Sequence, residues 1–159
     1  MTDSTSHAVR AAARDDVPRL VALMADFYGE AGFPLPTTAA AHAFGSLLDD
    51  PRLGRVWILE ADGEAAGFIV LTVAFSMEFG GLRGFVDDLF VRPRFRGRGL
   101  AAAGLAEARR TALEMGARAL CVEAGAENGP ARRVYERAGF VDGERLLLTL
   151  PLAAAVHER

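Results

Sequence analysis

Apolar side chains recur at two spacings along this chain, and the two spacings predict a mixture of helices and strands. Helical spacing occurs in four segments: 17–30, 37–50, about 100–116 and 128–139. Strand-like patterns occur in six segments: 7–12, 56–61, 65–75, 84–91, 118–124 and 145–150. Turn and cap residues such as Asp62-Gly63, Gly116 and Asn128-Gly129-Pro130 separate the elements.

The connections between these segments predict the sheet topology. Short turns join the strands between residues 56 and 91, which favours an antiparallel meander. The segment 84–124 is predicted to be strand, loop, helix and strand, so its two strands are expected to be parallel. We therefore predict a mixed α/β (α+β) sheet in one domain, residues 1–159. The sheet is mostly antiparallel, contains one central parallel pair and is flanked by helices.

Composition and charge remove several classes of protein from consideration. The 18 basic and 21 acidic residues give a net charge of −3, which argues against binding to nucleic acid by bulk charge. The single cysteine and three scattered histidines give no metal-ligand spacing, so no metal is expected. The chain has no lysine, which excludes a Walker-A loop and Schiff-base chemistry. A polar N-terminus and no membrane-length apolar run predict a cytoplasmic protein.

The segment from Arg96 to Ala101 is the most informative part of the sequence. Small residues at 97, 99 and 101 leave backbone N–H groups open at the start of a helix, where an anion is favoured. Arginines at 92, 94, 96 and 98 predict a local positive charge. Two other interpretations stay open at this point, namely a plain glycine-rich turn and a dinucleotide site that uses Glu123. The late position of the loop in the chain argues against the dinucleotide site.

The same residues resemble a known family. Arg96-Gly97-Arg98-Gly99-Leu100-Ala101 is similar to the R/Q-x-x-G-x-G/A signature of the GNAT superfamily of N-acetyltransferases. A second block, formed by Asn128, Ala131, Tyr135 and Gly139-Phe140, resembles the N-x-x-A-x-x-x-Y helix of that family. The resemblance runs from about Gly84 to Phe140. It implies a GNAT-like fold in which the parallel pair splays apart to admit acetyl-CoA.

The resemblance also implies roles for particular residues. Residues expected at the acetyl-CoA site are Leu89, Phe90, Val91, Arg96, Gly97, Arg98, Gly99, Leu100, Ala101, Asn128, Ala131 and Tyr135. The backbone N–H of Leu89 or Phe90 would stabilise the oxyanion, and Tyr135 would protonate the departing thiolate. Asp87 and Asp88 are candidates for the general base, with an ordered water as the alternative. Residues expected to contact the acceptor are Phe27, Tyr28, Phe33, Glu78 and Glu123.

The predicted activity is acetyl transfer from acetyl-CoA to a primary amine by direct attack in a ternary complex. The alternative is an acyl-CoA-binding sensor or interaction domain that has lost catalysis. The acceptor is expected to be a small molecule or peptide amine, with neither nucleic acid nor membrane as partner. The resemblance is compatible with a homodimer, although no segment of the sequence identifies an interface.

Overall fold

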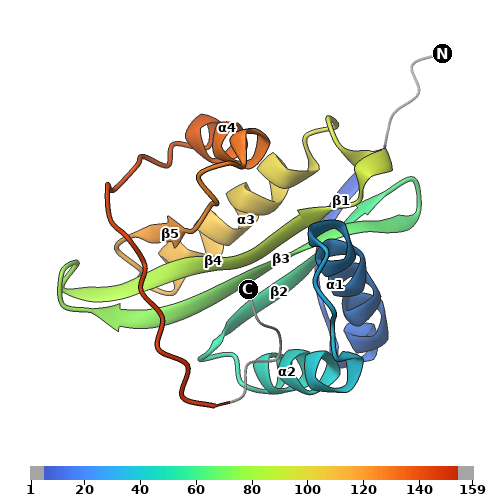
Figure 1. The fold of residues 1–159 in the computed structure, drawn as a ribbon, viewed down its shortest axis with the longest axis horizontal. Helices are drawn as coiled ribbons and strands as arrows, with labels where there is room; N and C mark the ends of the chain where they lie inside the picture. Colours follow the sequence, from blue (N-terminus) through green and yellow to red (C-terminus); the bar gives the residue numbers. More distant parts are fainter. Residues whose placement is uncertain (1–5, 154–159) are drawn as a thin grey trace.

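A computed structural model describes residues 6–153 as a five-stranded sheet with helices on both faces (Figure 1). The strands are β1 (His7–Ala11), β2 (Gly54–Ala61), β3 (Glu64–Ser76), β4 (Gly81–Val91) and β5 (Leu120–Val122). The α-helices are α1 (Val17–Ala31), α2 (Thr37–Asp49), α3 (Leu100–Glu114) and α4 (Gly129–Arg137). Two 3₁₀ turns, η1 (Arg14–Asp16) and η2 (Pro93–Phe95), precede α1 and α3.

The sheet has the mixed topology that the turn pattern predicts. The strand order is β1-β2-β3-β4-β5, with antiparallel pairing throughout except for the parallel pair β4–β5. The β2–β3 hairpin turns at Asp62 and Gly63, whose φ angles of 54° and 76° suit a two-residue turn. The predicted fold class is therefore confirmed.

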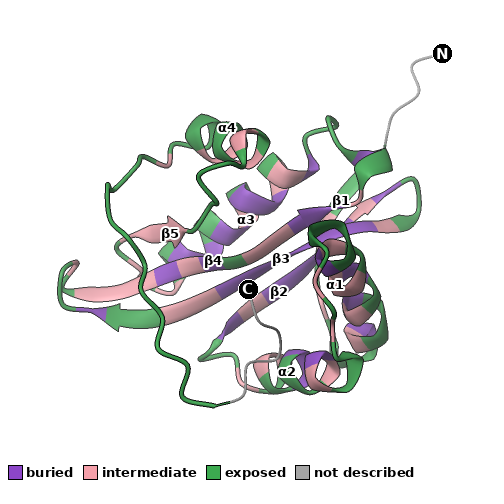
Figure 2. Cartoon of the chain, viewed as in Figure 1, coloured by how far each residue is buried: buried purple, intermediate pink, exposed green. Residues whose placement is uncertain are grey.

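Each face of the sheet has its own apolar core, because successive side chains on a strand point to opposite faces. On one face Leu59, Ile69 and Leu71 pack with α3, and residues of α4 lie against the same cluster. On the other face Phe68 and Val70 pack with α1 and α2. Figure 2 shows the buried residues concentrated in the central strands, while α4 and the chain after it are mostly exposed. The central strands are thus rigidly held between two helical layers.

Strand β4 contains a β-bulge in its pairing with β3. Val70 pairs with Asp88 but Leu71 pairs with Val86, so Asp87 is the extra residue on β4. Pairing between β4 and β5 stops at the same point, with Val86 opposite Val122 as the last pair. From Asp87 to Val91, β4 therefore has no strand on its β5 side within the described chain. The parallel strands diverge where the bulge begins.

The end of the chain departs from the sequence-based expectation. The predicted strand 145–150 is wrong for the chain described here, because residues 141–150 contain no helix or strand. The parallel strand after α3 is also shorter than predicted, covering three residues instead of 118–124. A strand needs a partner for its backbone, and the leucine-rich end of this chain has none in the structure.

Candidate active site at the β4–α3 loop

The loop between β4 and α3 presents a row of backbone N–H groups. Gly97 and Gly99 have φ angles of 74° and 82°, a left-handed backbone that favours glycine. Gly99 caps α3 without a side-chain hydrogen bond. Within the described residues, none of the backbone N–H groups from 97 to 102 donates a hydrogen bond to the protein. An added Cβ at 97 or 99 would meet no atom within 4 Å, so the cradle is open. Such a helix N-terminus is suited to an anion.

The four arginines of this loop are each paired with a carboxylate from another element. The pairs are Arg92 with Asp26, Arg94 with Glu64, Arg96 with Glu30 and Arg98 with Asp62. The expectation of a net positive loop is therefore wrong, since four opposite charges lie against the four arginines. The arginines instead fasten the loop to α1 and to the β2–β3 hairpin. Attraction for an anion comes from the helix end itself.

Arg96 also contacts the end of β4. Its Nε lies 2.8 Å from the carbonyl oxygen of Val91, and its Nη2 lies 2.9 and 2.7 Å from the Glu30 oxygens. One side chain thus joins the strand end, the loop and the C-terminal end of α1. The geometry gives Arg96 a positioning role for the loop.

Residues 89–91 form the edge of β4 beyond its last pair with β5, where the Val91 carbonyl accepts from Arg96 Nε. Phe90 is buried in the α1/α2 core and Val91 is buried on the α3 side, so their side chains are committed to packing. Their backbone, with that of Leu89, lies beyond the last β4–β5 pair. An extended ligand lying in the gap can pair with this edge as an added strand does.

Tyr135 lies on α4 and packs at the border of the α3 core. Its ring meets Phe140 edge to face, with centroids 5.7 Å apart. Burial raises the pKa of the Tyr135 phenol, and the negative charge of Asp88 raises it further. The structure thus brings together two residues that are 47 positions apart in the printed numbering (135 − 88). A phenol held protonated at neutral pH can donate a proton.

The start of α4 is built as the sequence predicts. Asn128 is the N-cap, and its side-chain oxygen accepts a hydrogen bond from the Ala131 N–H at 3.2 Å. Pro130 occupies the first turn, where the lack of an N–H has no cost. Asn128 and Ala131 therefore set the direction of the helix that carries Tyr135.

Three aromatic residues predicted at the acceptor site lie around the C-terminal half of α1. Phe27 stacks on Phe90, with ring centroids 5.2 Å apart, and Tyr28 is 5% exposed. Both therefore belong mainly to the core on the α1/α2 face. Phe33 is half-buried in the connection to α2, where its N–H donates to the carbonyl of Tyr28. Of the three, Phe33 is the one placed outside a helix.

The predicted acidic residues are not gathered in one place. Asp87 at the bulge is exposed, and Glu123 is exposed just after β5, so both border the gap. Glu78 lies in the β3–β4 turn and forms an ion pair with Arg145 at 2.7 Å. Asp88 lies seven positions after Gly81 along β4, which corresponds to roughly 20 Å. The structure does not bring Glu78 to the other candidates.

An open depression of about 710 Å³ lies between α1 and the end of β4. It is lined by Ala25, Asp26, Gly29, Glu30, Phe90, Arg92, Pro93 and Arg94. The polar face of α1 that lines this depression is not among the site residues predicted from the sequence. The signal was present, because Asp26 and Glu30 are four residues apart and therefore share one face of the helix.

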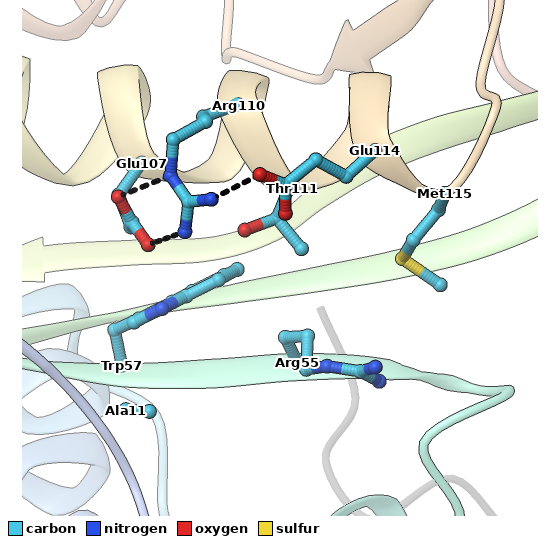
Figure 3. Close-up of a pocket in the computed structure, with 8 residues that line it drawn as sticks. All are labelled: Ala11, Arg55, Trp57, Glu107, Arg110, Thr111, Glu114 and Met115. Atoms are coloured by element: carbon cyan, nitrogen blue, oxygen red, sulfur yellow. Dashed lines mark hydrogen bonds and ion pairs between the residues drawn. The ribbon is translucent and has the colours of Figure 1, made fainter.

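A second depression, of about 390 Å³, lies between α3 and the β1–β2 edge (Figure 3). Figure 3 shows Arg110 between Glu107 and Glu114 along α3, with hydrogen bonds to both carboxylates. These contacts satisfy the charges within one helix surface. The α3 residues that line the depression belong to the C-terminal half of the helix, so the depression is separate from the loop at the N-terminal end of α3.

Residues 6–153 contain neither a candidate cluster of metal ligands nor a candidate membrane-spanning helix. No group of three or more histidine, cysteine, aspartate or glutamate side chains is arranged to hold a metal ion in this range. No helix in the same range is both long and apolar enough to cross a bilayer.

Comparison with known proteins identifies the family. The model of the Acetyltransferase (GNAT) family matches residues 17–140, and the chain belongs to this family. The sequence matches none of the curated proteins with which it was compared. The family assignment agrees with the two sequence blocks and with the splayed parallel strands.

Solved structures share the fold over nearly the whole chain. An integron cassette protein from the mobile metagenome of Cole Harbour Salt Marsh is 52% identical, with a TM-score of 0.86 and coverage of 94% of this chain and 93% of that one. Aminoglycoside N-acetyltransferase AAC(6')-Iy in complex with CoA is 20% identical, with a TM-score of 0.83 and coverage of 96% and 99%. A predicted acetyltransferase with acetyl-CoA from Clostridium acetobutylicum is 22% identical, with a TM-score of 0.75 and coverage of 91% and 96%.

Proposed function

We propose that the protein is an N-acetyltransferase that uses acetyl-CoA to modify a primary amine of an acceptor not yet identified. The observation that carries this proposal is the row of unpartnered N–H groups at residues 97–102, on the loop that bears the GNAT signature. Diphosphate is the anion that such a row fits, because several oxygens can accept from successive N–H groups. Two structural neighbours hold CoA or acetyl-CoA, which supports the same choice.

Acetyl-CoA would supply the thioester carbonyl and a thiolate leaving group. The residues that would hold it are the backbone of 97–102 at the diphosphate and the edge of β4 at 89–91 along the pantetheine arm. Asn128 and Ala131 would lie toward its sulfur end, at the start of α4. Arg96 would act by positioning the loop through Val91 and Glu30.

Tyr135 would act as general acid. Its pKa is raised by burial and by Asp88, so the phenol keeps its proton at neutral pH and has it available for a departing sulfur. Asp88 or Asp87 would take the proton of the acceptor amine, directly or through a water molecule. Asp88 is the stronger candidate, because its charge raises the pKa of Tyr135 and it therefore lies near the proposed general acid. The backbone N–H of Leu89 or Phe90 would meet the carbonyl oxygen.

The acceptor would approach from the α1 side of β4, where the open depression of about 710 Å³ lies. Phe33, Glu123 and the polar face of α1 would border it. Among the structural neighbours, AAC(6')-Iy has been solved with a bisubstrate analogue of CoA and acetylneamine, and another is described as a ribosomal-protein-alanine N-acetyltransferase. Amines of both kinds therefore belong in the first screen.

A thermal-shift titration with acetyl-CoA, with NAD as control, tests the cofactor assignment first. A ligand at 100 times its dissociation constant stabilises by about 2.7 kcal/mol, which corresponds to a rise of a few degrees in Tm. An amine screen that follows released CoA thiol then tests turnover, with Tyr135→Phe as the matched variant. A protein that binds acetyl-CoA but acetylates no amine would be the acyl-CoA sensor instead. The absence of any shift with acetyl-CoA would contradict both assignments.

A further inference from the structure

The depression between the C-terminal half of α3 and the β1–β2 edge contains two buried polar side chains that have no partner in the described chain (Figure 3). Trp57 is 4% exposed and Thr111 is 8% exposed, so both residues are more than nine-tenths buried. Within residues 6–153, neither the indole N–H of Trp57 nor the hydroxyl of Thr111 takes part in a hydrogen bond. Buried polar groups nearly always have a partner, so two that line one depression suit it to a ligand.

The β2 wall of the depression also carries a guanidinium with spare donors. Arg55 and Trp57 are two positions apart on the strand, so their side chains share the α3 face of the sheet. The Nη1 of Arg55 donates to the carbonyl oxygens of Pro51 and Gly54, whereas its Nε and Nη2 donate to no atom of the described chain. These two nitrogens form the edge of a guanidinium that pairs with a carboxylate through two parallel hydrogen bonds.

The carboxylates of the α3 wall are already engaged. The Nε and Nη2 of Arg110 donate to the two oxygens of Glu107, and its Nη1 donates to Glu114. Hydrogen bonds from Arg110 lower the pKa of Glu107, so that carboxylate stays charged and paired at neutral pH. A cationic ligand would therefore compete with Arg110, whereas a ligand that accepts hydrogen bonds would meet donors that nothing else uses.

The rest of the lining is apolar and the space is small. Ala11 and Met115 line the depression together with the indole ring of Trp57. Figure 3 shows Thr111 and Met115 pointing from α3 toward the sheet, with Trp57 and Arg55 on the opposite wall. The volume of about 390 Å³ lies at the lower end of the range for small-molecule sites. The lining thus fits a compact ligand with an apolar body and a group that accepts hydrogen bonds.

We propose that this depression binds a small organic monocarboxylate, at a site separate from that of acetyl-CoA. The carboxylate would accept hydrogen bonds from Arg55 and from Thr111 or Trp57, and the apolar body would pack on Met115 and the indole ring. Thr111 lies 12 positions after Gly99 (111 − 99), which corresponds to roughly 18 Å along α3. The depression and the diphosphate loop can therefore be occupied together.

Binding of cyclohexanecarboxylate tests the site first, because this probe has the carboxylate and the apolar body and does not absorb where tryptophan does. Isothermal titration measures its Kd, and the fluorescence of Trp57, the single tryptophan of the chain, reports binding beside the indole ring. We expect saturable binding of the carboxylate, binding of cyclohexanecarboxamide that is weaker by roughly 10-fold or more, and no binding of cyclohexylamine. Tighter binding of the amine than of the carboxylate would overturn the proposal.

Substitutions in the lining test which groups hold the carboxylate. Arg55→Gln should raise the Kd of the probe roughly 10- to 100-fold, and Thr111→Val, which keeps the shape of the side chain, roughly 3- to 10-fold. Arg52→Gln is the matched control, since Arg52 pairs with Asp50 on the surface and lies outside the lining. Unchanged affinity in both lining variants, or an equal loss in the control, would contradict the assignment.

Acetyl-CoA distinguishes this depression from the diphosphate loop, which also suits an anion. We expect the same Kd for the probe with and without saturating acetyl-CoA. Competition between the two ligands would place the carboxylate on the loop and overturn the proposal, as would the absence of probe binding at millimolar concentrations. A chain that binds the carboxylate but not acetyl-CoA would contradict the proposed function and would leave this site supported.

Discussion

The carboxylate of Asp88 on β4 lies close enough to the phenol of Tyr135 on α4 for its negative charge to raise the pKa of that phenol. Burial raises the pKa of Tyr135 above its usual value near 10, and the charge of Asp88 adds to this shift. The two residues are therefore coupled, and a change at one should be measurable at the other.

Asp88→Asn should lower the pKa of Tyr135, because the neutral amide no longer opposes ionisation of the phenol. The chain has two tyrosines, so Tyr28→Phe leaves Tyr135 as the sole phenol for titration by ultraviolet absorbance. If Tyr135 is the proton donor, the alkaline limb of kcat should move to lower pH by the same amount. Asp87→Asn is the control, and an equal shift in both variants would contradict a specific coupling.

Gly97→Ala and Gly99→Ala should weaken binding of acetyl-CoA. Each glycine has a left-handed backbone, which costs an alanine about 1–2 kcal/mol, and relief of that strain turns the N–H row away. The expected rise in the dissociation constant is roughly 5- to 30-fold. Isothermal titration measures it directly.

Gly116→Ala is the control for the loop glycines. Gly116 has a φ of 83° at the other end of α3, and an added Cβ there also meets nothing within 4 Å. An alanine at 116 has the same backbone strain as one at 97 or 99 but lies outside the loop. The free energy of unfolding should therefore fall, while the affinity for acetyl-CoA should not change. Equal losses of affinity in all three variants would show that strain alone is responsible.

Gly67→Ala should destabilise the centre of the sheet. A Cβ at this position would lie 2.1 Å from the carbonyl oxygen of Phe90, a contact with backbone that only a shift of β3 or β4 can relieve. The expected loss is about 1–3 kcal/mol in the free energy of unfolding, measured by urea denaturation. Gly125→Ala, where a Cβ meets nothing within 4 Å, should leave stability nearly unchanged.

Asp16→Asn should destabilise the junction between β1 and α1. The buried Asp16 accepts hydrogen bonds from Arg10, Arg19 and the N–H of Ala13, at 2.7–3.0 Å. Removing one partner from a buried ion pair costs about 3–5 kcal/mol, and the remaining polarity of asparagine puts this variant at the lower end. Asp15→Asn, at the exposed neighbouring position, is the control.

The stabilisation from Asp16 should depend on pH. Hydrogen bonds from Arg10 hold the pKa of this carboxyl well below its usual range, so it stays charged in the folded chain while it titrates near 4 in the unfolded chain. Its contribution is therefore complete above about pH 4 and falls as pH drops toward the folded pKa. The stability difference between parent and Asp16→Asn should narrow in that acid range. A stability difference between parent and variant that does not change with pH would contradict an ionic origin of the stabilisation by Asp16.

The fold was predictable from the sequence wherever a local signal agreed with its surroundings. The Asp62-Gly63 turn, the Asn128 cap and the apolar spacing of α1 each specify an element without help from distant residues. The segment 145–150 has an equally strong strand pattern but forms no strand. Periodicity predicts which face of a strand is buried, but it does not identify the neighbouring strand that would complete its backbone hydrogen bonds.

The site was predictable in its backbone and less so in its charges. Glycines at 97 and 99 before a helix identify the N–H row directly. The pairing of Arg96 with Glu30 connects residues 66 positions apart, and local sequence contains no trace of it. The position of Glu78 was also not predictable from local sequence. Its charge resembles that of Asp88, but it lies near the opposite end of β4.

The extra residue at Asp87 sets the phase of everything after it on β4. Leu89 and Val91 contact the α3 core and Phe90 contacts the α1 core only because one position is counted twice at the bulge. Regular pairing of β4 through Asp87, without the bulge, would turn each of these side chains toward the wrong layer at once. The bulge therefore keeps both cores and the loop aligned with one another, and a β4 strand that contained all of these residues but paired regularly would present the wrong side chains to both cores.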